Sequence, residues 1–286
     1  MANVTAIIPT YNEELNIKEC LLSLMGFVEK IILMDYNSTD RTKEIAESLG
    51  AIVLQSSKSY KERLNIGIEH SLVTTKWVLN IDADERLTPK CLKELNLLCD
   101  KYENDEKVNG IVLKYENIFM GKHLHFGFKP RKMRLFKKGC AYLENKELDE
   151  HFILKKGTTK SCKSSLIHKD FKGIKPLIIK WNEYAYRSAN EIIDWENKNI
   201  TIETEGLANI SKFRRLIKYK VFIHLPINVR SQLLFYYYYY LRLGFLDGEK
   251  GRLFLFLQTY WYRYLIDAYL LEYEYHNKKE YTSNKC

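Results

Sequence analysis

Short apolar runs alternate with helical patterns through the first third of the chain, and this alternation constrains the fold more than any other feature. The apolar runs have the length of buried strands and lie at 4–8, 31–34, 51–54 and 77–81. The helical patterns between them lie at 13–25, 41–49 and 60–72. Asn12 is the expected N-cap of the first helix, and Thr88-Pro89 opens a fourth, because Thr caps well and Pro fits the first turn. This alternation predicts an α/β fold, in which a mostly parallel sheet carries helices on both faces.

The chain beyond residue 105 loses this regular alternation. Strands are expected at 110–115, 133–136 and 164–168, and one long helix is expected at 172–199. From 206 to 246 the chain has seven Lys or Arg and no Asp or Glu, and 13 of its 21 tyrosines follow residue 218. We therefore expect a domain over 1–205, with halves of about 1–105 and 106–205, and a basic, tyrosine-rich helical segment over 206–286.

Composition excludes several classes of protein. Hydrophobic residues make up 46% of the chain, against 13 Gly and 5 Pro, which excludes collagen-like and disordered chains. The six cysteines form no CxxC pair and match no zinc spacing, so we expect free thiols in a reducing compartment. No signal peptide and no apolar run of about 20 residues is visible, so we expect a cytoplasmic protein. The net charge of +9 suggests an anionic partner, but no nucleic-acid motif accompanies it and no nucleic acid is expected.

Two acidic clusters follow apolar runs directly. Asp35 ends the second run, and Asp82-Ala83-Asp84 ends the fourth. In open α/β sheets the ligand crevice lies at the carboxyl ends of the strands, where both clusters are expected to meet. An Asp-x-Asp turn can aim two carboxylates at a hard divalent cation, which in turn can bridge the phosphates of a nucleotide diphosphate. Taken alone, such a triplet is more often a solvated turn, but its position directly after the apolar run 77–81 favours a binding site.

Three segments in order resemble the inverting glycosyltransferases of family two, which have the GT-A fold. The opening strand and loop of that family resemble Ile7-Ile8-Pro9-Thr10-Tyr11-Asn12-Glu13-Glu14. Its second nucleotide loop resembles Asp35-Tyr36-Asn37-Ser38-Thr39-Asp40. Its metal-binding motif resembles Asp82-Ala83-Asp84-Glu85. An arginine-containing strand of the family resembles residues 131–136, and its acceptor-side acidic motif resembles Leu148-Asp149-Glu150-His151. A C-terminal signature of its lipopolysaccharide-core and exopolysaccharide members resembles Leu243-Gly244-Phe245-Leu246-Asp247-Gly248. The resemblance covers nearly the whole chain. Asn37 departs from the glycine common at its position, but Asn tolerates the left-handed conformation that such a turn needs.

The resemblance implies roles for particular residues. The nucleotide would be held by Pro9, Tyr11, Glu13, Asp35, Arg63 and Asp82. Mn²⁺ or Mg²⁺ would be bound by Asp84, with His168 as a further ligand of the metal or the diphosphate, and Arg131 or Arg134 would clamp the diphosphate. Glu150 or its neighbour Asp149 would be the general base, and the sequence does not separate the two.

The same resemblance implies a donor and an acceptor. The donor would be a nucleotide-diphosphate sugar, with UDP favoured, and the reaction would invert the anomeric configuration. The acceptor would be a lipid-linked glycan, a polysaccharide or a lipopolysaccharide-type molecule of the cell envelope. Two alternatives remain open: transfer to a polyprenyl phosphate, and a non-catalytic binding or scaffold protein on the same fold.

The tyrosine run 236–240 suggests where the enzyme works. Eleven residues separate Arg230 from Arg242 and ten separate Arg252 from Arg263, too few for a helix that crosses a bilayer. Aromatic segments flanked by basic residues instead suit the headgroup region of an anionic membrane. We therefore expect a protein peripheral on the inner face of the cell membrane. The same helices could alternatively bury a homodimer interface.

Overall fold

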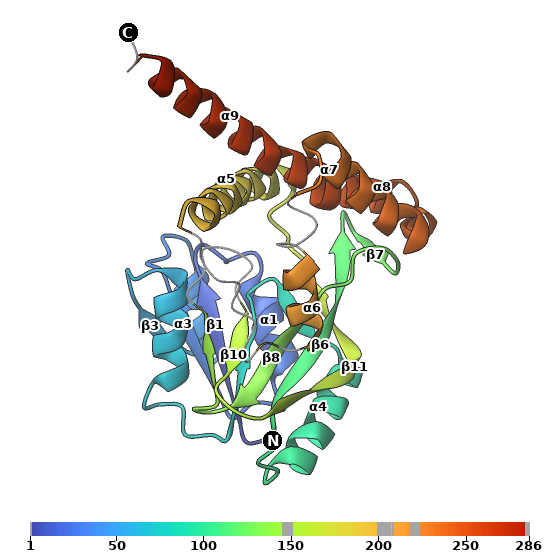
Figure 1. Cartoon of the computed structure of the whole chain (residues 1–286). Coiled ribbons are helices and arrows are strands. Elements are labelled where there is room, and N and C mark those ends of the chain that lie inside the picture. The colour runs from blue at the N-terminus through green and yellow to red at the C-terminus, as the bar shows by residue number, and fades with distance from the viewer. Residues whose placement is uncertain (1, 145–150, 199–206, 208, 218–223, 284–286) are drawn as a thin grey trace.

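A mixed sheet forms the centre of the structure, and its parallel half follows the order of the chain. The computed structural model describes residues 2–144, 151–198, 207, 209–217 and 224–283. Within these residues a nine-stranded sheet has the order β3-β2-β1-β4-β8-β6-β11-β5, with β7 paired to β6. The strands of this parallel half are β1 (Val4–Thr10), β2 (Lys30–Asp35), β3 (Ile52–Gln55) and β4 (Trp77–Asn80). Their carboxyl ends therefore lie at one edge, the upper edge in Figure 1.

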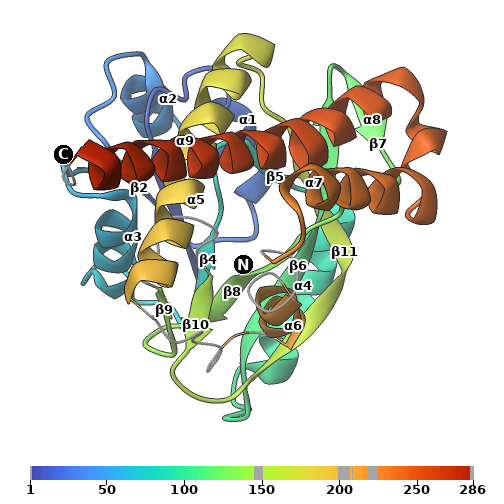
Figure 2. The same ribbon diagram turned by 45° about the horizontal axis from the view of Figure 1, so that its top comes forward.

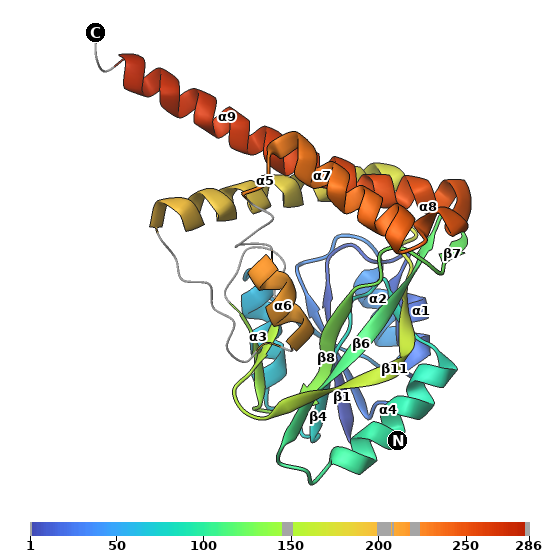
Figure 3. The ribbon, with the colours of Figure 1, turned by 45° about the vertical axis from the view of Figure 1, so that its right-hand side comes forward.

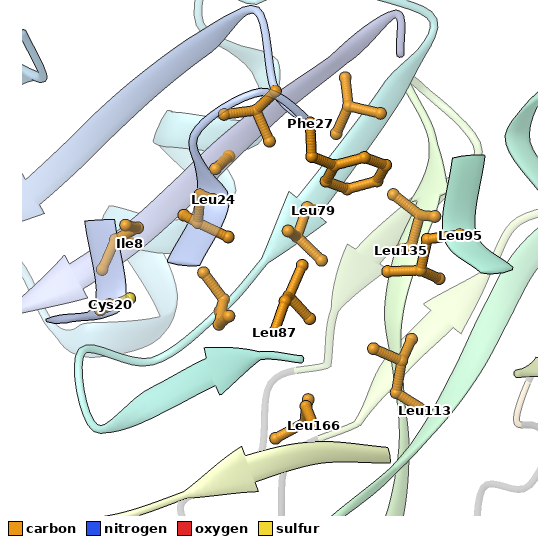
Figure 4. Close-up of a cluster of buried hydrophobic side chains, with 14 of the residues drawn as sticks. Ile8, Cys20, Leu24, Phe27, Leu79, Leu87, Leu95, Leu113, Leu135 and Leu166 are labelled. Carbon is orange, nitrogen blue, oxygen red and sulfur yellow. The ribbon is translucent and has the colours of Figure 1, made fainter. Parts of the chain in front are cut away.

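Helices cover both faces of the parallel half, as the alternation predicts. They are α1 (Ile17–Leu24), α2 (Thr42–Ser48), α3 (Tyr60–Glu69) and α4 (Pro89–Tyr102). On β1, Ile8 joins the core formed with α1, α2 and α4 (Figure 4), whereas its neighbour Ile7 joins the core formed with α3. Successive strand residues point to opposite faces, so a continuous apolar run buries both.

Among the described residues, five further strands extend the sheet; three of them are longer than the sequence predicted, and two of three residues each were not predicted. These strands are β5 (Glu85–Leu87), β6 (Val108–Phe119), β7 (Lys122–Leu124), β8 (Arg131–Lys137) and β11 (Thr158–His168). A separate pair is formed by β9 (Ala141–Leu143) and β10 (Phe152–Leu154). Because β8 runs antiparallel to β4, the first residues of β8 lie at the carboxyl end of β4.

The start of the first helix differs from the sequence prediction. Helix α1 begins at Ile17, after Asn16, and not at residue 13 after Asn12. Asn12 instead has a φ of 52°, and its side chain accepts a hydrogen bond from the Thr39 amide at 2.9 Å. Asn side chains bond readily to nearby backbone, which competes with helix formation. The loop after β1 is consequently longer than predicted and is tied to the loop after β2.

A layer of helices lies above the carboxyl edge of the parallel strands (Figures 1 and 3). It contains α5 (Ile174–Lys198), α7 (Ile227–Tyr236), the π-helix η2 (Tyr237–Leu241), the 3₁₀-helix η3 (Gly244–Asp247), α8 (Gly248–Leu255), the π-helix η4 (Phe256–Trp261) and α9 (Tyr262–Ser283). Helix α9 crosses α5 (Figure 2), where Ile266 packs on Ala185 and Ala189. The described part of the chain contains no helix with the length and apolarity needed to cross a membrane.

The turn at Gly244–Asp247 fixes this layer to the sheet. The buried carboxylate of Asp247 accepts hydrogen bonds from the amides of His125 and Phe126, both at 2.9 Å. A Cβ atom at Gly244 would lie 2.8 Å from the carbonyl oxygen of Tyr238, so only glycine fits this turn. The segment that resembles a C-terminal family signature therefore acts as a clasp between the helices and the strand β7.

Candidate active site

Asp35 organises the loops at the ends of β1 and β2. It is fully buried and accepts hydrogen bonds from Thr10 Oγ1 at 2.9 Å and from the amide of Ser38 at 2.8 Å. Asn37 has a φ of 51°, so the left-handed turn that the sequence suggested does form. Asp35 therefore ties the end of β1 to the loop that follows β2.

Two exposed aromatic rings lie above this buried network. Tyr11 and Tyr36 are 53% and 41% exposed, and their rings meet edge to face with centroids 5.6 Å apart. The guanidinium of Arg63 lies 4.7 Å from the centroid of Tyr36 and donates to the carbonyl oxygens of Met34 at 2.8 Å and Thr10 at 3.3 Å. Burial lowers the pKa of Arg63. Arg63 thus joins the ends of β1 and β2 and supports a surface on which a flat base could stack.

Pro9 and Glu13 have supporting positions beside these rings. Pro9 is buried within β1. The carboxylate of Glu13 lies 2.6 Å from Lys172 Nζ and 2.8 Å from Asn16 Nδ2, and burial raises its pKa despite these two partners. Glu13 therefore fastens the loop after β1 to the segment that leads into α5.

Arg134 of β8 forms hydrogen bonds with the Asp-x-Asp turn and the residues around it. Its guanidinium donates to the carboxylate of Asp82, to Glu85 Oε1 at 2.6 Å, to Asn80 Oδ1 at 2.5 Å and to the hydroxyl of Tyr115. Arg134 is buried, and the charges of Asp82 and Glu85 raise its pKa although burial opposes them. The arginine predicted to clamp a diphosphate is thus committed to protein groups, and in this arrangement it positions Asp82.

Glu85 is a member of the site that the sequence did not single out. Its buried carboxylate accepts the Asp82 amide at 3.0 Å, which closes the turn from below. Burial, together with the charges of Asp82 and Asp84, raises the pKa of Glu85 to about 7, while Arg134 opposes the shift. Glu85 is paired with His168 across β5 and β11, a contact between distant parts of the chain that no local pattern reveals.

Asp84 and His168 form a pair at the same edge. His168 Nε2 lies 3.2 Å from Asp84 Oδ2. Burial alone would raise the pKa of Asp84, but the positive charges of His168, Lys180 and Arg86 hold the pKa of that carboxyl well below its usual range. Burial likewise opposes the charged form of His168, yet Asp84 raises its pKa. The two residues that the resemblance assigned to the metal are therefore brought together.

This pair suits a divalent cation that a substrate also binds. No group of three or more His, Cys, Asp or Glu converges as a metal site among the residues that the structure describes. One carboxylate oxygen and one imidazole nitrogen are ligands that Mn²⁺ accepts, and Mg²⁺ or Mn²⁺ at phosphate sites commonly keeps few protein ligands. The donor set therefore fits a metal whose remaining positions are filled by phosphate oxygens and water.

Lys180 of α5 is a further residue that sequence reasoning missed. Desolvation would lower its pKa, but the negative charges of Asp84, Asp170 and Asp82 raise it. Lys180 thus brings a cation from the helical layer to the carboxylates of the sheet edge. The only sequence signal is its place on a long amphipathic helix, which does not identify a partner.

A small hollow opens beside Asp82. It is lined by Tyr60, Asn80, Asp82, Lys132, Met133, Arg134, Leu143, His151 and Phe152. Arg131, the other predicted clamp, is exposed at the start of β8, at the carboxyl end of β4. Asp149 and Glu150 lie outside the described residues, but Leu143 and His151, which flank that segment in sequence, both line the hollow.

Helix α6 (Asn209–Ile217) is tied to the same side of the site. The buried guanidinium of Arg215 forms two hydrogen bonds to the buried carboxylate of Glu144, at 2.9 and 2.5 Å. Glu144 also accepts the His151 amide at 2.8 Å. The basic segment after residue 206 therefore reaches the edge of the hollow as well as the helical layer.

Two exposed tyrosine rings lie at the ends of the first two strands, and two carboxylates lie close together after the fourth. These features resemble those of the glycosyltransferases that use nucleotide sugars on a GT-A fold. Residues 5–154, just over half of the 286, match the family model described as glycosyl transferase family 2. The chain belongs to that family, which confirms the resemblance and the fold class predicted from the sequence.

Two relatives of this chain are described as glycosyltransferases. An uncharacterized glycosyltransferase of Rickettsia felis is 28% identical over 247 residues, which cover 78% of this chain and 82% of the relative. The lipopolysaccharide core biosynthesis glycosyltransferase LpsC of Rhizobium meliloti is 26% identical over 209 residues, which cover 67% of this chain and 72% of LpsC.

Solved structures give more distant matches. Glucosyl-3-phosphoglycerate synthase of Mycobacterium tuberculosis, in complex with Mn²⁺, UDP and glucosyl-3-phosphoglycerate, has 21% identity and a TM-score of 0.31, covering 42% of this chain and 45% of the synthase. Mannosyl-3-phosphoglycerate synthase of Rubrobacter xylanophilus has 19% identity and a TM-score of 0.34, covering 41% of each chain. The chain thus spans less than half of either synthase, and the family assignment depends on the family model alone.

Proposed function

We propose that the protein is a metal-dependent, inverting glycosyltransferase that moves a sugar from a UDP-sugar to a hydroxyl of a lipid-linked glycan or lipopolysaccharide-type acceptor. The observation that carries this proposal is the Asp84–His168 pair, with Nε2 and Oδ2 3.2 Å apart, beside the hollow that Asp82 lines. A donor bound across this edge would place its base on Tyr36, its diphosphate near Asp84 and its sugar in the hollow. A scaffold protein would need no such pair.

The residues of this chain divide the work of the reaction. Asp84 and His168 would hold Mn²⁺ or Mg²⁺, which supplies Lewis-acid stabilisation to the departing diphosphate when bound. The ammonium of Lys180 would add a fixed positive charge at the place where negative charge develops. Asp82, held by Arg134, would accept a hydrogen bond from the ribose or the sugar. Glu150 or Asp149 would remove the proton of the acceptor hydroxyl as it attacks from the opposite side of the sugar, which inverts the configuration.

A donor panel tests this proposal directly. We expect one nucleotide-diphosphate sugar to raise the melting temperature of the full chain in the presence of Mn²⁺ and to lose this effect in EDTA. A ligand at 100 times its dissociation constant adds about 2.7 kcal/mol to the free energy of unfolding, which a thermal shift measures readily. Failure of every nucleotide sugar to stabilise the protein with Mn²⁺ would contradict the proposal. Transfer activity that survives replacement of both Asp149 and Glu150 would favour a polyprenyl-phosphate acceptor, which is already an anion.

The role of the aromatic rings is tested by Tyr36→Ala. Stacking of a base on an aromatic side chain contributes about 1–3 kcal/mol, so we expect the variant to bind UDP at least about fivefold more weakly, as measured by titration calorimetry. Tyr275→Ala removes a similarly exposed tyrosine far along α9 and serves as the control. Equal UDP affinity in the two variants would show that the base does not stack on Tyr36.

A further inference from the structure

Helix α7 and the π-helix η2 expose a stripe of large apolar side chains. On α7 and η2 the exposed residues recur every three or four positions and are Val229, Leu233, Tyr236, Tyr237, Tyr240 and Leu241. This spacing places them along one side of the helix. Leu241, at the end of the stripe, is 76% exposed, so the stripe is not simply the rim of a buried core.

A second stripe lies on the neighbouring segment α8–η4–α9. The rings of Phe256, Tyr260 and Tyr264 stack in a row, with centroids 5.2 and 5.9 Å apart. Phe256 also meets Phe235 of α7 edge to face at 6.4 Å, which joins the two stripes. The turn between the segments adds three more exposed apolar side chains, Leu243, Phe245 and Leu246. We call the exposed residues of both stripes and the turn the aromatic face.

The scaffold beneath the aromatic face is fixed. Phe235 and Tyr238 point inward and pack with Phe254 and Leu255 on Phe119 of β6. The clasp at Asp247 holds the turn, and a buried ion pair joins Arg230 of α7 to Asp267 of α9, with Nε and Oδ1 2.7 Å apart. Arg230, expected from the sequence to flank the tyrosine run as a surface cation, therefore serves inside the layer. A rigid, exposed apolar face of this kind marks an interaction site.

The exposed charged residues near the aromatic face indicate which partner it binds. Exposed cations interrupt or border it at Arg242, Lys250 and Arg252, whereas Glu249 is the one exposed acid among residues 227–264 of the described chain. A second copy docked through a twofold axis would set this cationic patch against itself, because such an interface pairs the same patch on both subunits. Anionic lipid headgroups complement both features, since Tyr favours the interfacial zone and basic residues attract acidic lipids.

We propose that the aromatic face binds the headgroup region of a bilayer that contains anionic lipids. Leu233, Tyr240 and Leu241 enter the boundary with the acyl chains, and Arg242 and Arg252 contact phosphate groups. The same helical layer covers the carboxyl edge of the sheet (Figures 1 and 3), so membrane binding holds the Asp84 edge near the surface from which a lipid-linked acceptor would come. The binding itself does not depend on the proposed reaction.

Vesicle sedimentation of the full chain tests the proposal. We expect the protein to sediment with vesicles of phosphatidylcholine mixed with phosphatidylglycerol and much less with phosphatidylcholine alone. Burial of a leucine side chain is worth about 1.5–3 kcal/mol, so Leu233→Ser with Leu241→Ser should lower partition at least about tenfold. Each nearby cation is worth about 1 kcal/mol, so Arg242→Gln should cost about fivefold, and only on the anionic vesicles. Leu97→Ser on α4, where Leu97 is 70% exposed, is the matched control and should bind as the wild type does.

Three outcomes would overturn the proposal. The first is a wild-type protein that stays in the supernatant with anionic vesicles. The second is a double variant that keeps its native circular dichroism and partitions as strongly as the Leu97→Ser control. The third is a dimer, seen by light scattering, that Leu241→Ser converts to a monomer while vesicle binding is absent, which would assign the face to a second copy of the chain.

Discussion

Replacing Arg134 with methionine is expected to lower the free energy of unfolding by about 3–5 kcal/mol, because the change leaves buried charges without their partner. Arg134 donates to Asp82, Glu85, Asn80 and Tyr115, and no solvent reaches Glu85 to take its place. Urea unfolding measures the loss as a lower midpoint with little change in slope. Arg131→Met is the matched control, since Arg131 lies on the same strand but is exposed, and it should change stability by no more than about 0.5 kcal/mol.

The loss in the Arg134 variant should depend on pH in a defined direction. The pKa of Glu85 is already raised from 4.5 to about 7, and removal of Arg134 takes away the charge that opposes this shift. The pKa of the folded state then lies further above that of the unfolded chain, so between the two values the folded state binds more protons. Both proteins lose stability alike up to about pH 7, where the wild-type Glu85 titrates, so the extra loss in the variant appears above that pH and should be larger at pH 8 than at pH 5. Equal losses at both pH values would mean that Glu85 is not the group left unpaired.

The parallel half of the fold could be predicted from the sequence because its signals are local. Each apolar run of four or five residues became a strand, and Thr88 caps α4 with its side chain, which accepts the Cys91 amide. Strands β5 and β7, only three residues long, were missed because so short a segment carries no period of its own. Their pairing depends on β11 and β6, which lie far away in the chain.

The sequence predicted where the candidate site lies, but it did not predict which residues its buried charges contact. Asp82, Asp84, Asp35 and Tyr11 follow strands whose ends meet at one edge, so the sequence places them together. The partners of a buried charge could not be predicted in this way, because they come from elements that lie far apart in the sequence. Nothing local indicates that Arg134 binds Asp82 and Glu85, or that the charges of Asp84 and Lys180 on α5 act on each other. The roles expected of Arg134 and Asp35 as direct ligands followed from motif position alone, and no local pattern indicates that both side chains are buried and bonded to protein groups.

Replacing Asp84 with asparagine should have the largest effect on transfer. Asp84 lies among the positive charges of His168, Lys180 and Arg86, which hold its pKa well below the usual range and keep the carboxylate charged. The amide keeps the shape of the side chain but leaves those cations unopposed, so a divalent cation approaching this edge is repelled. Removal of one preorganised electrostatic group commonly costs about 10²–10³ in rate, and we expect a loss of kcat/KM of that order or larger.

A measurement of Mn²⁺ binding distinguishes a metal-binding role of Asp84 from a purely structural one. Electron paramagnetic resonance of free Mn²⁺ should show uptake by the wild type with UDP present and little uptake by Asp84→Asn. Asp105→Asn, a carboxylate-to-amide change at the opposite end of the sheet, should bind Mn²⁺ and react as the wild type does. If Asp84→Asn lost activity yet kept the wild-type affinity for Mn²⁺, the carboxylate would act on the sugar and the metal would be held elsewhere. Full activity of the variant in EDTA would mean that the cations around Asp84, above all Lys180, stabilise the departing diphosphate without a metal.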